Sequence, residues 1–197
     1  MVMNNDLKIG CVLLAAGEGK RFGGNKLMAD FNGKPILEHV LAALPKEVFE
    51  RCVIVAADQK RLELADKYGV SGVINDKPEE GIARSIRMGI EEIGKVDGCM
   101  FLVCDQPMLK SDTISGMVKY YTKDTIFALS THGKRGNPVI FPAKLLPELR
   151  MLTSQQTGVD VINEHSEKLK LYDIVEGIEL MDIDTKGDLM ALNKDIL

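Results

Sequence analysis

The sequence predicts an α/β fold in which a mostly parallel sheet lies between two layers of helices. Continuous apolar runs of strand length occupy residues 8–15, 51–57 and 99–104, and such runs are typical of strands that are buried on both faces. Segments with helical periodicity separate these runs, and this alternation favours a parallel sheet. The 197 residues contain no internal repeat, low-complexity segment or Pro/Ser-rich linker. We therefore expect a single domain over residues 1–197.

Local signals predict the elements of the first two thirds of the chain. Pro35 is expected at the first position of a helix over PILEHVLAAL, and Gly69 is placed to end a second helix over residues 59–68. A short strand at 72–74 precedes the segment GIARSIRMGIEEI, whose isoleucines form one helical stripe. Ser111 is expected to cap a further helix.

The last third of the chain predicts a different arrangement. The strands TIFALST and PVIF are separated by an expected loop, HGKRGN, and helical stretches follow near residues 143–151 and 158–164. A strand, LKLYDIV, and a helix from about Thr185 complete the chain. The first two of these strands lie close together in the sequence, so we expect a small antiparallel edge or insertion beside the parallel sheet.

Composition excludes several classes of protein. The net charge of −4 argues against a nucleic-acid partner, which requires an extended basic face. No apolar run approaches the length of a membrane span, and the N-terminal residues MVMNNDLK lack the residue order of a signal peptide. We therefore expect a cytoplasmic protein with neither a nucleic-acid nor a membrane partner.

Cysteine and histidine usage limits the possible metal sites. The four cysteines lie in apolar, strand-like runs without a CxxC pattern, which indicates small buried side chains rather than zinc ligands or disulfides. Cys99 and Cys104 are expected on opposite faces of the sheet. The three histidines are scattered. Any metal site must therefore consist of carboxylates, which favours magnesium.

A glycine-rich basic loop, residues 17–26, directly follows the first strand. It fits a dinucleotide-binding GxGxxG poorly, because the third glycine stands one place late and no acidic residue follows at the usual distance. It also fails as a Walker A loop, because Asn25 stands in the place of the lysine. The remaining interpretation is a phosphate site in which Arg21 and Lys26 fold over a triphosphate. Backbone N–H groups of residues 15–19 would surround the phosphates.

Other polar segments are expected beside this loop. Ligands of parallel sheets bind at the carboxyl ends of the strands, so residues 75–81 and 105–107 should share one rim with the loop. Asp105 ends a buried strand, where a carboxylate is costly. We interpret Asp105 as a magnesium ligand, with a simple turn cap before Pro107 as the alternative.

Four segments together resemble a known family. LLAAGEGKRFGGNKL is similar to the signature loop LAAGxxxRMGxxK of nucleotidyltransferases that release pyrophosphate, with Phe22 in place of the common methionine. VCDQPML, GNPVIF and DIDTKGDL resemble segments of the molybdenum cofactor cytidylyltransferase branch of the MobA-like NTP transferases. The resemblance implies a Rossmann-like, three-layer α/β/α fold of the nucleotide-diphospho-sugar transferase type. It also implies Mg²⁺-dependent transfer of CMP from CTP to the phosphate of a molybdopterin-type acceptor.

The resemblance carries roles to particular residues. It implies Arg21 and Lys26 as catalytic residues and Asp105 and Asp184 as metal ligands, with Asp182 open as an alternative to Asp184. The implied nucleotide-binding residues are Leu14, Ala15, Ala16, Gly17, Glu18, Gly19, Asp76, Gly81 and Ser85. The candidates for acceptor binding are Arg84, Lys134, Arg135 and Asn137, the last in place of a frequent histidine.

The sequence leaves open the base of the nucleotide, the identity of the acceptor and whether the protein is catalytic. A narrow pocket at Gly81 and Ser85 suits a pyrimidine better than a purine, so we expect CTP over GTP. The alternatives are guanylyl transfer, another acceptor such as a sugar or polyol phosphate, and a non-catalytic protein that escorts a cofactor to a client molybdoenzyme. Retention of Arg21, Lys26 and Asp105 argues against the escort, because a scaffold has no need for a magnesium carboxylate.

Overall fold

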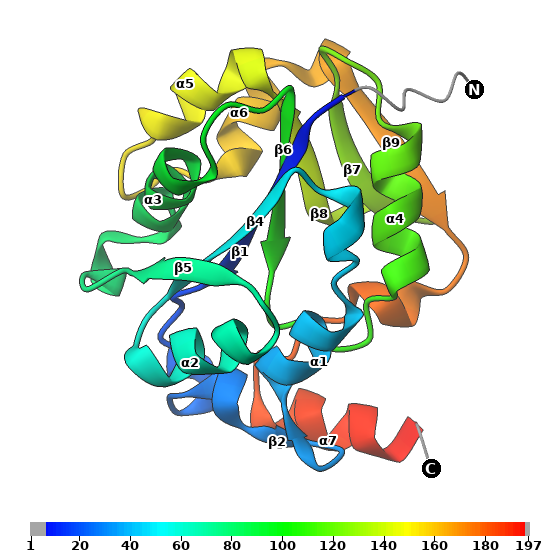
Figure 1. Cartoon of the computed structure of the whole chain (residues 1–197). Helices are drawn as coiled ribbons and strands as arrows, with labels where there is room; N and C mark the ends of the chain where they lie inside the picture. Colours follow the sequence, from blue (N-terminus) through cyan, green and yellow to red (C-terminus); the bar gives the residue numbers. More distant parts are fainter. Residues whose placement is uncertain (1–6, 196–197) are drawn as a thin grey trace.

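Seven strands form the central sheet of the computed structural model, which describes residues 7–195 (Figure 1). They are β1 (Ile9–Ala15), β4 (Arg51–Ala56), β5 (Ser71–Ile74), β6 (Gly98–Val103), β7 (Ile126–Thr131), β8 (Lys134–Pro142) and β9 (Leu169–Ile174). Their order across the sheet is β5-β4-β1-β6-β8-β7-β9. A separate antiparallel hairpin, which the sequence patterns did not indicate, consists of β2 (Asp30–Phe31) and β3 (Lys34–Pro35).

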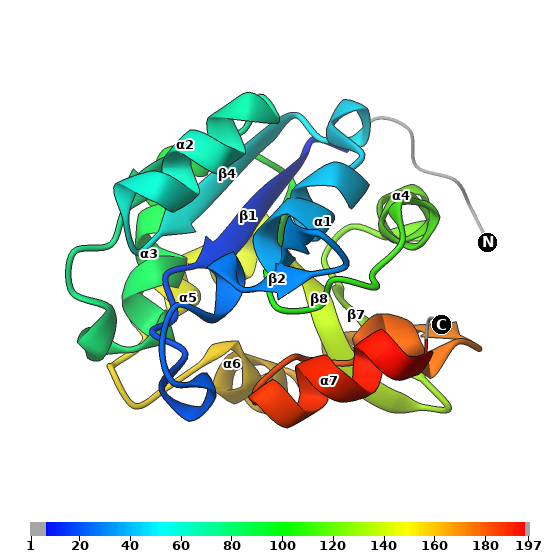
Figure 2. The same cartoon turned by 90° about the horizontal axis from the view of Figure 1, so that it is seen from below.

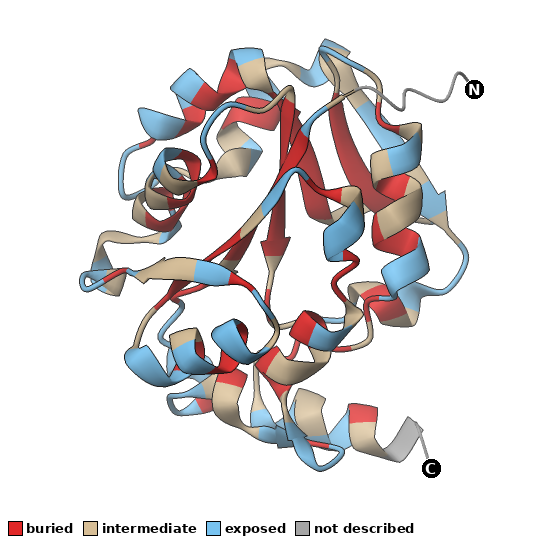
Figure 3. Ribbon diagram, viewed as in Figure 1, coloured by how far each residue is buried: buried red, intermediate tan, exposed pale blue. Residues whose placement is uncertain are grey.

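Helices cover both faces of the sheet. They are α1 (Ile36–Ala43), α2 (Gln59–Lys67), α3 (Ile82–Ile93), α4 (Ser111–Tyr120), α5 (Leu146–Arg150), α6 (Gly158–Glu164) and α7 (Lys186–Asp195). Buried side chains of α1, α2 and α4 pack against one face, and those of α3, α5 and α6 pack against the other (Figure 1). The buried residues follow the sheet through the centre of the molecule (Figure 3). The expected three-layer α/β/α arrangement is therefore confirmed.

The parallel part of the sheet consists of the apolar strands that the sequence identified. β1 lies between β4 and β6 and is parallel to both, with Cys11 opposite Cys52 on one side and Met100 on the other. β5 adds to β4, again in parallel. The carboxyl ends of these strands point toward α7 and the β2–β3 hairpin, which is the end of the molecule that faces the viewer in Figure 2.

The antiparallel component is present, but it lies inside the sheet rather than at an edge. β8 runs antiparallel to both β6 and β7, whereas β9 pairs with β7 in parallel. Only His132 and Gly133 join β7 to β8, and both have positive φ (49° and 72°), as tight hairpin turns require. The predicted loop HGKRGN is therefore wrong beyond its first two residues, because Lys134, Arg135 and Asn137 belong to β8.

Two helix starts also differ from expectation. Pro35 has an extended backbone (φ −54°, ψ 143°) and pairs with Asp30 in the β2–β3 hairpin, so α1 begins one residue later. Ser111 is the first helical residue of α4 rather than its cap. Lys110 occupies the cap position, and its N–H donates to Glu179 Oε2 at 3.0 Å. In both cases a neighbouring segment, rather than the local sequence, sets the boundary.

The isoleucine stripe of α3 is buried with one exception. Ile86, Ile90 and Ile93 pack against the sheet, as the periodicity predicted. Ile82, at the start of the helix, is 38% exposed because it faces the hollows of the candidate active site.

The cysteines are free, as expected, and Cys99 and Cys104 pack in different apolar layers. Burial raises the pKa of both thiols. Among residues 7–195, no helix is both long enough and apolar enough to cross a bilayer. Residues 1–6, on which part of the signal-peptide expectation rests, lie outside the described range.

Candidate active site

Three segments that are far apart in the sequence meet at the carboxyl end of the parallel strands, as predicted. They are the glycine-rich loop after β1, the segment between β5 and α3, and the turn after β6. Between them lies a hollow of about 200 Å³, here called the small hollow. Its wall contains Gly17, Gly19 and Lys26 from the loop, Gly81 and Ser85 around the start of α3, and Asp105 after β6.

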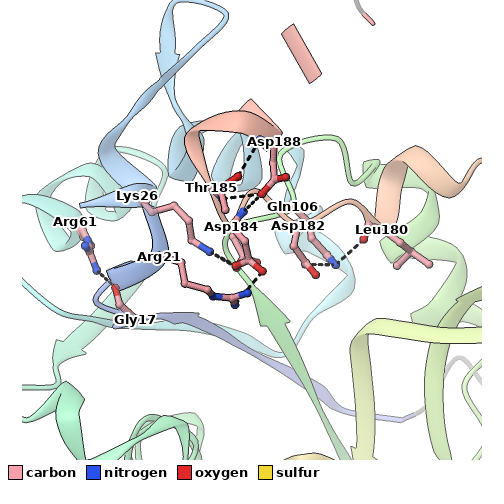
Figure 4. A network of polar contacts seen from close by, with 11 residues as sticks. Gly17, Arg21, Lys26, Arg61, Gln106, Leu180, Asp182, Asp184, Thr185 and Asp188 are labelled. Carbon is pink, nitrogen blue, oxygen red and sulfur yellow. Dashed lines mark hydrogen bonds and ion pairs between the residues drawn. The ribbon is translucent and has the colours of Figure 1, made fainter. Parts of the chain in front are cut away.

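A charged cluster lies at one side of the small hollow. Lys26 Nζ is 2.7 Å from Asp105 Oδ2. It is also 3.1 Å from Asp184 Oδ1, and Arg21 Nη2 is 3.0 Å from Asp184 Oδ2 (Figure 4). These side chains come from the loop, the turn after β6 and the segment before α7. The Lys26 side chain is only 12% exposed, whereas that of Arg21 is 75% exposed. The structure therefore assembles the four charged residues that the sequence selected.

The protonation of Lys26 follows from these contacts. Partial burial lowers the pKa of a lysine, but the hydrogen bonds and charges of Asp105 and Asp184 outweigh burial here and raise the pKa of Lys26 above its ordinary value. Lys26 is therefore a cation throughout the neutral pH range.

The two aspartates fit a hard divalent cation. Their carboxylates converge on one positive group, Lys26 Nζ, and Asp105 Oδ1 is buried without a hydrogen-bond partner. Carboxylate oxygens are the ligands that Mg²⁺ prefers. Asp182 is placed differently, because its Oδ1 accepts a hydrogen bond from Gln106 Nε2 at 2.9 Å. Partial burial and the neighbouring Asp105 carboxylate raise the pKa of Asp182. The geometry therefore favours Asp184 as the partner of Asp105.

The start of α7 holds Asp184 in place. Asp188 Oδ2 accepts hydrogen bonds from the backbone N–H groups of Asp184 (3.0 Å) and Thr185 (2.7 Å), and the Asp188 N–H donates to Thr185 Oγ1 (Figure 4). The hydrogen bonds that the Asp188 carboxylate accepts from Thr185 and from the Asp184 N–H lower the pKa of Asp188. The segment DTKGD is thus a helix cap, and the cap orients the backbone that carries Asp184.

Ser85 lines the small hollow, and a buried asparagine orients it. Asn75 is fully buried, and its Nδ2 donates to Ser85 Oγ at 3.0 Å. Because Ser85 Oγ accepts this bond, its own hydrogen is available for a ligand in the hollow. Asn75 was not selected as a site residue from the sequence, because a lone asparagine after a strand looks like any turn residue.

Asp76 and Arg84 form an ion pair with each other beside the small hollow. Arg84 Nη2 lies 2.6 Å from Asp76 Oδ1, and Arg84 Nη1 lies 3.3 Å from Glu80 Oε2. Neither Asp76 nor Arg84 is among the described residues that line the small hollow or the larger one next to it. Arg84 Nε also donates to Asn75 Oδ1 at 2.8 Å, so Arg84 contacts the same asparagine that orients Ser85. The structure pairs Asp76 and Arg84 with each other, and their contacts with the nucleotide and the acceptor stay predictions.

Gly81 closes the small hollow against a neighbouring segment. Its φ is 85°, and a Cβ at this position would lie 2.6 Å from the carbonyl oxygen of Ser154. The clash is with backbone, so a side chain would push Ser154 and the start of α3 apart. Gly94 offers a matched comparison, because its φ is 77° but a Cβ there would meet no atom within 4 Å.

We expect Gly94→Ala to lose about 1–3 kcal/mol of stability, because it forces a side chain into a backbone region that favours glycine. Gly81→Ala should lose more, because its Cβ also clashes with the Ser154 carbonyl. Only Gly81→Ala should also weaken nucleotide binding, because only there does the new Cβ move the wall of the hollow. Urea melts and nucleotide titrations of the two variants measure these effects. Unchanged nucleotide affinity in Gly81→Ala would show that this wall does not contact the nucleotide.

A larger hollow of about 610 Å³, here called the large hollow, continues from the small one. The two share Leu14, Ile82 and Val103 as lining residues. The floor of the large hollow is apolar and includes Phe101 and Phe141. Its polar lining residues are Gln106, Thr131, Lys134, Arg135, Asn137, Thr157 and Asp182. The structure therefore places Lys134, Arg135 and Asn137 in one cavity, as the sequence suggested.

Three buried polar atoms of residues that line the large hollow have no hydrogen-bond partner. They are Gln106 Oε1, Thr131 Oγ1 and Arg135 Nη1. Buried polar groups are normally paired, so such atoms indicate a place where a ligand supplies the partner. Neither Gln106 nor Thr131 is among the site residues selected from the sequence, because their positions in the sequence show nothing of what they face.

Arg61 is a further residue that the sequence reasoning missed. It lies in α2 but is only 3% exposed, and its guanidinium reaches the backbone carbonyls of the glycine-rich loop. Burial lowers the pKa of Arg61, and the nearby Asp58 carboxylate partly opposes this effect. In the segment QKRLELADK, Arg61 is indistinguishable from the solvated charges that surround it.

Comparisons with known proteins bear on the family to which the chain belongs. The model of the MobA-like NTP transferase domain matches residues 11–169. A molybdenum cofactor guanylyltransferase of Shewanella sediminis is 30% identical over 148 residues, which cover 73% of this chain and 72% of that protein. The bifunctional protein GlmU of Streptomyces avermitilis is 34% identical over 120 residues, which are 57% of this chain but only 25% of GlmU. The molybdopterin-guanine dinucleotide biosynthesis protein A of Archaeoglobus fulgidus has a similar fold, with a TM-score of 0.73, 21% identity and coverage of 95% of this chain and 98% of that one. This chain therefore belongs to the MobA-like NTP transferase family.

Proposed function

We propose that the protein transfers CMP from CTP to the phosphate of a molybdopterin-type acceptor and releases pyrophosphate, with Mg²⁺ as cofactor. The observation that carries the proposal is the cluster of Arg21, Lys26, Asp105 and Asp184 beside two connected hollows. The two cations can neutralise the negative charge of a triphosphate, and the two aspartates can bind a metal ion. The two hollows offer separate places for a nucleotide and an acceptor.

The reaction joins two anions, so charge neutralisation and alignment supply most of the catalysis. A phosphate oxygen of the acceptor forms a bond to the α-phosphorus of CTP. The bond from this phosphorus to the bridging oxygen of pyrophosphate breaks, and the electron pair leaves with pyrophosphate. Lys26 and Arg21 neutralise the charge that grows on the leaving group, and the backbone N–H groups of residues 15–19 bind the phosphates.

Asp105 and Asp184 are the proposed ligands of Mg²⁺. The ion, when bound, neutralises phosphate charge and polarises phosphate oxygens. Lys26 holds the two carboxylates together at 2.7 and 3.1 Å. The incoming triphosphate gives Lys26 and Arg21 a new anionic partner, which frees both aspartates for the cation.

The large hollow is the proposed acceptor site. Its apolar floor can hold a ring system, and the unpaired atoms of Gln106, Thr131 and Arg135 offer polar contacts at its wall. Lys134 and Asn137 line the same cavity. A molybdopterin-type acceptor is supported by the relative that is 30% identical, a molybdenum cofactor guanylyltransferase.

The choice of CTP rests on the small hollow. Its volume is about 200 Å³, and the absence of a side chain at Gly81 lets this backbone lie close to the Ser154 carbonyl. A pyrimidine occupies less of this space than a purine does, which supports CTP as the proposed donor. The hydroxyl of Ser85, oriented by Asn75, can donate a hydrogen bond to the base.

The test is pyrophosphate release from each NTP with Mg²⁺ and each candidate acceptor. We expect kcat/KM for CTP to exceed that for GTP at least about tenfold, because excluding the larger ring is worth ~1.4 kcal/mol or more. A preference for GTP would replace the donor in the proposal but not the acceptor. Release only with a sugar or polyol phosphate would replace the acceptor. No release with any pair would indicate the non-catalytic escort.

A further inference from the structure

Arg61, a buried residue of α2, contacts both ends of the glycine-rich loop. Its Nη1 donates to the carbonyl oxygens of Ala15 (2.7 Å) and Gly17 (3.3 Å), where the loop begins. Its Nη2 donates to Asn25 Oδ1 (3.4 Å), where the loop ends. Figure 4 shows the guanidinium directed at Gly17, on the side of the loop away from Asp184. One buried side chain thus contacts two points of the loop that are eight residues apart in the chain.

The contacts at the first end orient backbone donors. In a trans peptide, the C=O of one residue and the N–H of the next point in opposite directions. Arg61 holds the carbonyls of Ala15 and Gly17, so the N–H groups of Ala16 and Glu18 face the other way. Ala16 lines the small hollow, and Glu18 lines an adjacent hollow together with Lys26, Asp105 and Asp184. The N–H groups that are proposed to bind phosphate therefore owe their direction to Arg61.

The contact at the second end reaches Lys26. Asn25 has a left-handed backbone (φ 48°) and precedes the short turn Lys26–Met28. Its side chain is held by Arg61, and the next residue, Lys26, extends to Asp105 and Asp184. A shift at Asn25 would move the base of Lys26.

We infer that Arg61 is a positioning residue that fixes the glycine-rich loop in its phosphate-binding conformation. It does not touch the nucleotide; it aligns the N–H groups of Ala16 and Glu18 and the stem of Lys26. Its buried charge is partly balanced by Asp58, whose Oδ2 lies 3.3 Å from Nε. The inference deepens the proposed function and rests on it only for the identity of the anion.

The first test uses Arg61→Met, Arg61→Lys and the control Lys60→Met, which removes an exposed charge from the same helix. Arg61→Met should weaken the binding of inorganic pyrophosphate and lower kcat/KM roughly tenfold to a hundredfold, since misplacement of about 1 Å can cost a factor of that size. KM for the nucleotide should rise and kcat should fall together. Arg61→Lys retains one cationic donor and should recover part of the loss, and Lys60→Met should behave as wild type. All measurements belong well below the melting temperature of each variant.

A second measurement does not depend on the reaction. Amide hydrogen exchange should become faster in residues 16–25 of Arg61→Met, while β1 and β4 keep their protection. Asn25→Gly keeps the left-handed backbone, removes only the second contact of Arg61, and should accelerate exchange mainly near Lys26. Wild-type exchange of the loop in Arg61→Met, with wild-type affinity for pyrophosphate, would overturn the inference. By contrast, a wild-type protein that releases no pyrophosphate from any NTP would remove the proposed function, and the exchange result would still decide the role of Arg61.

Discussion

Asp105→Asn should lower magnesium-dependent pyrophosphate release about a thousandfold, because losing a ligand charge at the reacting phosphates removes ~4 kcal/mol of transition-state stabilisation. The substitution keeps the shape of the side chain and removes its charge. In the structure, Asp105 Oδ2 contacts Lys26 at 2.7 Å, and Asp105 Oδ1 has no partner. The fold should survive, because the apolar strand that ends before Asp105 is unchanged.

Initial rates over a wide range of Mg²⁺ concentrations, together with thermal melts, measure this effect. Asp66→Asn is a suitable control, because Asp66 is an exposed carboxylate on α2, remote in sequence from the cluster. Rates that recover at high Mg²⁺ would indicate weakened ion binding alone. Wild-type rates at ordinary Mg²⁺ would leave Asp105 as only a turn residue.

Lys26→Ala should lower turnover about a hundredfold to a thousandfold, while the Kd for the nucleotide changes far less. A preorganised cation acts mainly where charge develops, which is on the departing pyrophosphate. The variant should also melt at a lower temperature without Mg²⁺ than with it, because Asp105 and Asp184 lose the cation that lies between them.

The stability that Lys26 contributes to the fold depends on pH in a direction that follows from its pKa. Its pKa is raised above the ordinary 10.5 by contacts with Asp105 and Asp184, against the opposing effect of burial. The stability that it contributes is therefore fully present below that ordinary pKa and is lost only as the pH rises through the higher folded value. The difference in melting temperature between wild type and Lys26→Ala should thus be constant across neutral pH.

Lys20→Ala is the control for Lys26→Ala, since Lys20 lies in the same loop but is 78% exposed and pairs with Glu18. Wild-type turnover in Lys26→Ala would contradict its proposed role.

Features encoded in short windows of sequence could be predicted. The apolar runs of β1, β4 and β6 imply burial on both faces, and helices between them imply parallel pairing. Parallel pairing in turn places the ends of these strands at one rim. Arg21, Lys26 and Asp105 could be selected for this reason, and the structure brings them together.

Other features could not be predicted because they depend on where distant elements lie. The apolar pattern of a strand does not reveal which strands lie beside it, so only the sheet order shows that β8 lies inside the sheet. The structure likewise shows that β8 includes Lys134, Arg135 and Asn137. The boundaries at Pro35 and Ser111 shifted for a similar reason, since a hairpin and a distant glutamate supply the hydrogen bonds there.

Charged side chains show most clearly what the sequence alone does not predict. Arg61 and Arg84 both lie in helices and look alike in sequence, yet Arg61 is buried beneath the loop while Arg84 pairs with Asp76 at the surface. The sequence by itself determined the apolar strands, the glycine-rich loop and the acidic end of β6, because periodicity and backbone sterics act over a few residues. The tertiary structure alone decided that Arg61 contacts the loop and that Asp184, rather than Asp182, faces Lys26 beside Asp105. It also decided which buried polar atoms remain unpaired. A charge or hydrogen bond is satisfied by whichever partner the fold brings within about 3 Å, and separation along the chain says nothing about that distance.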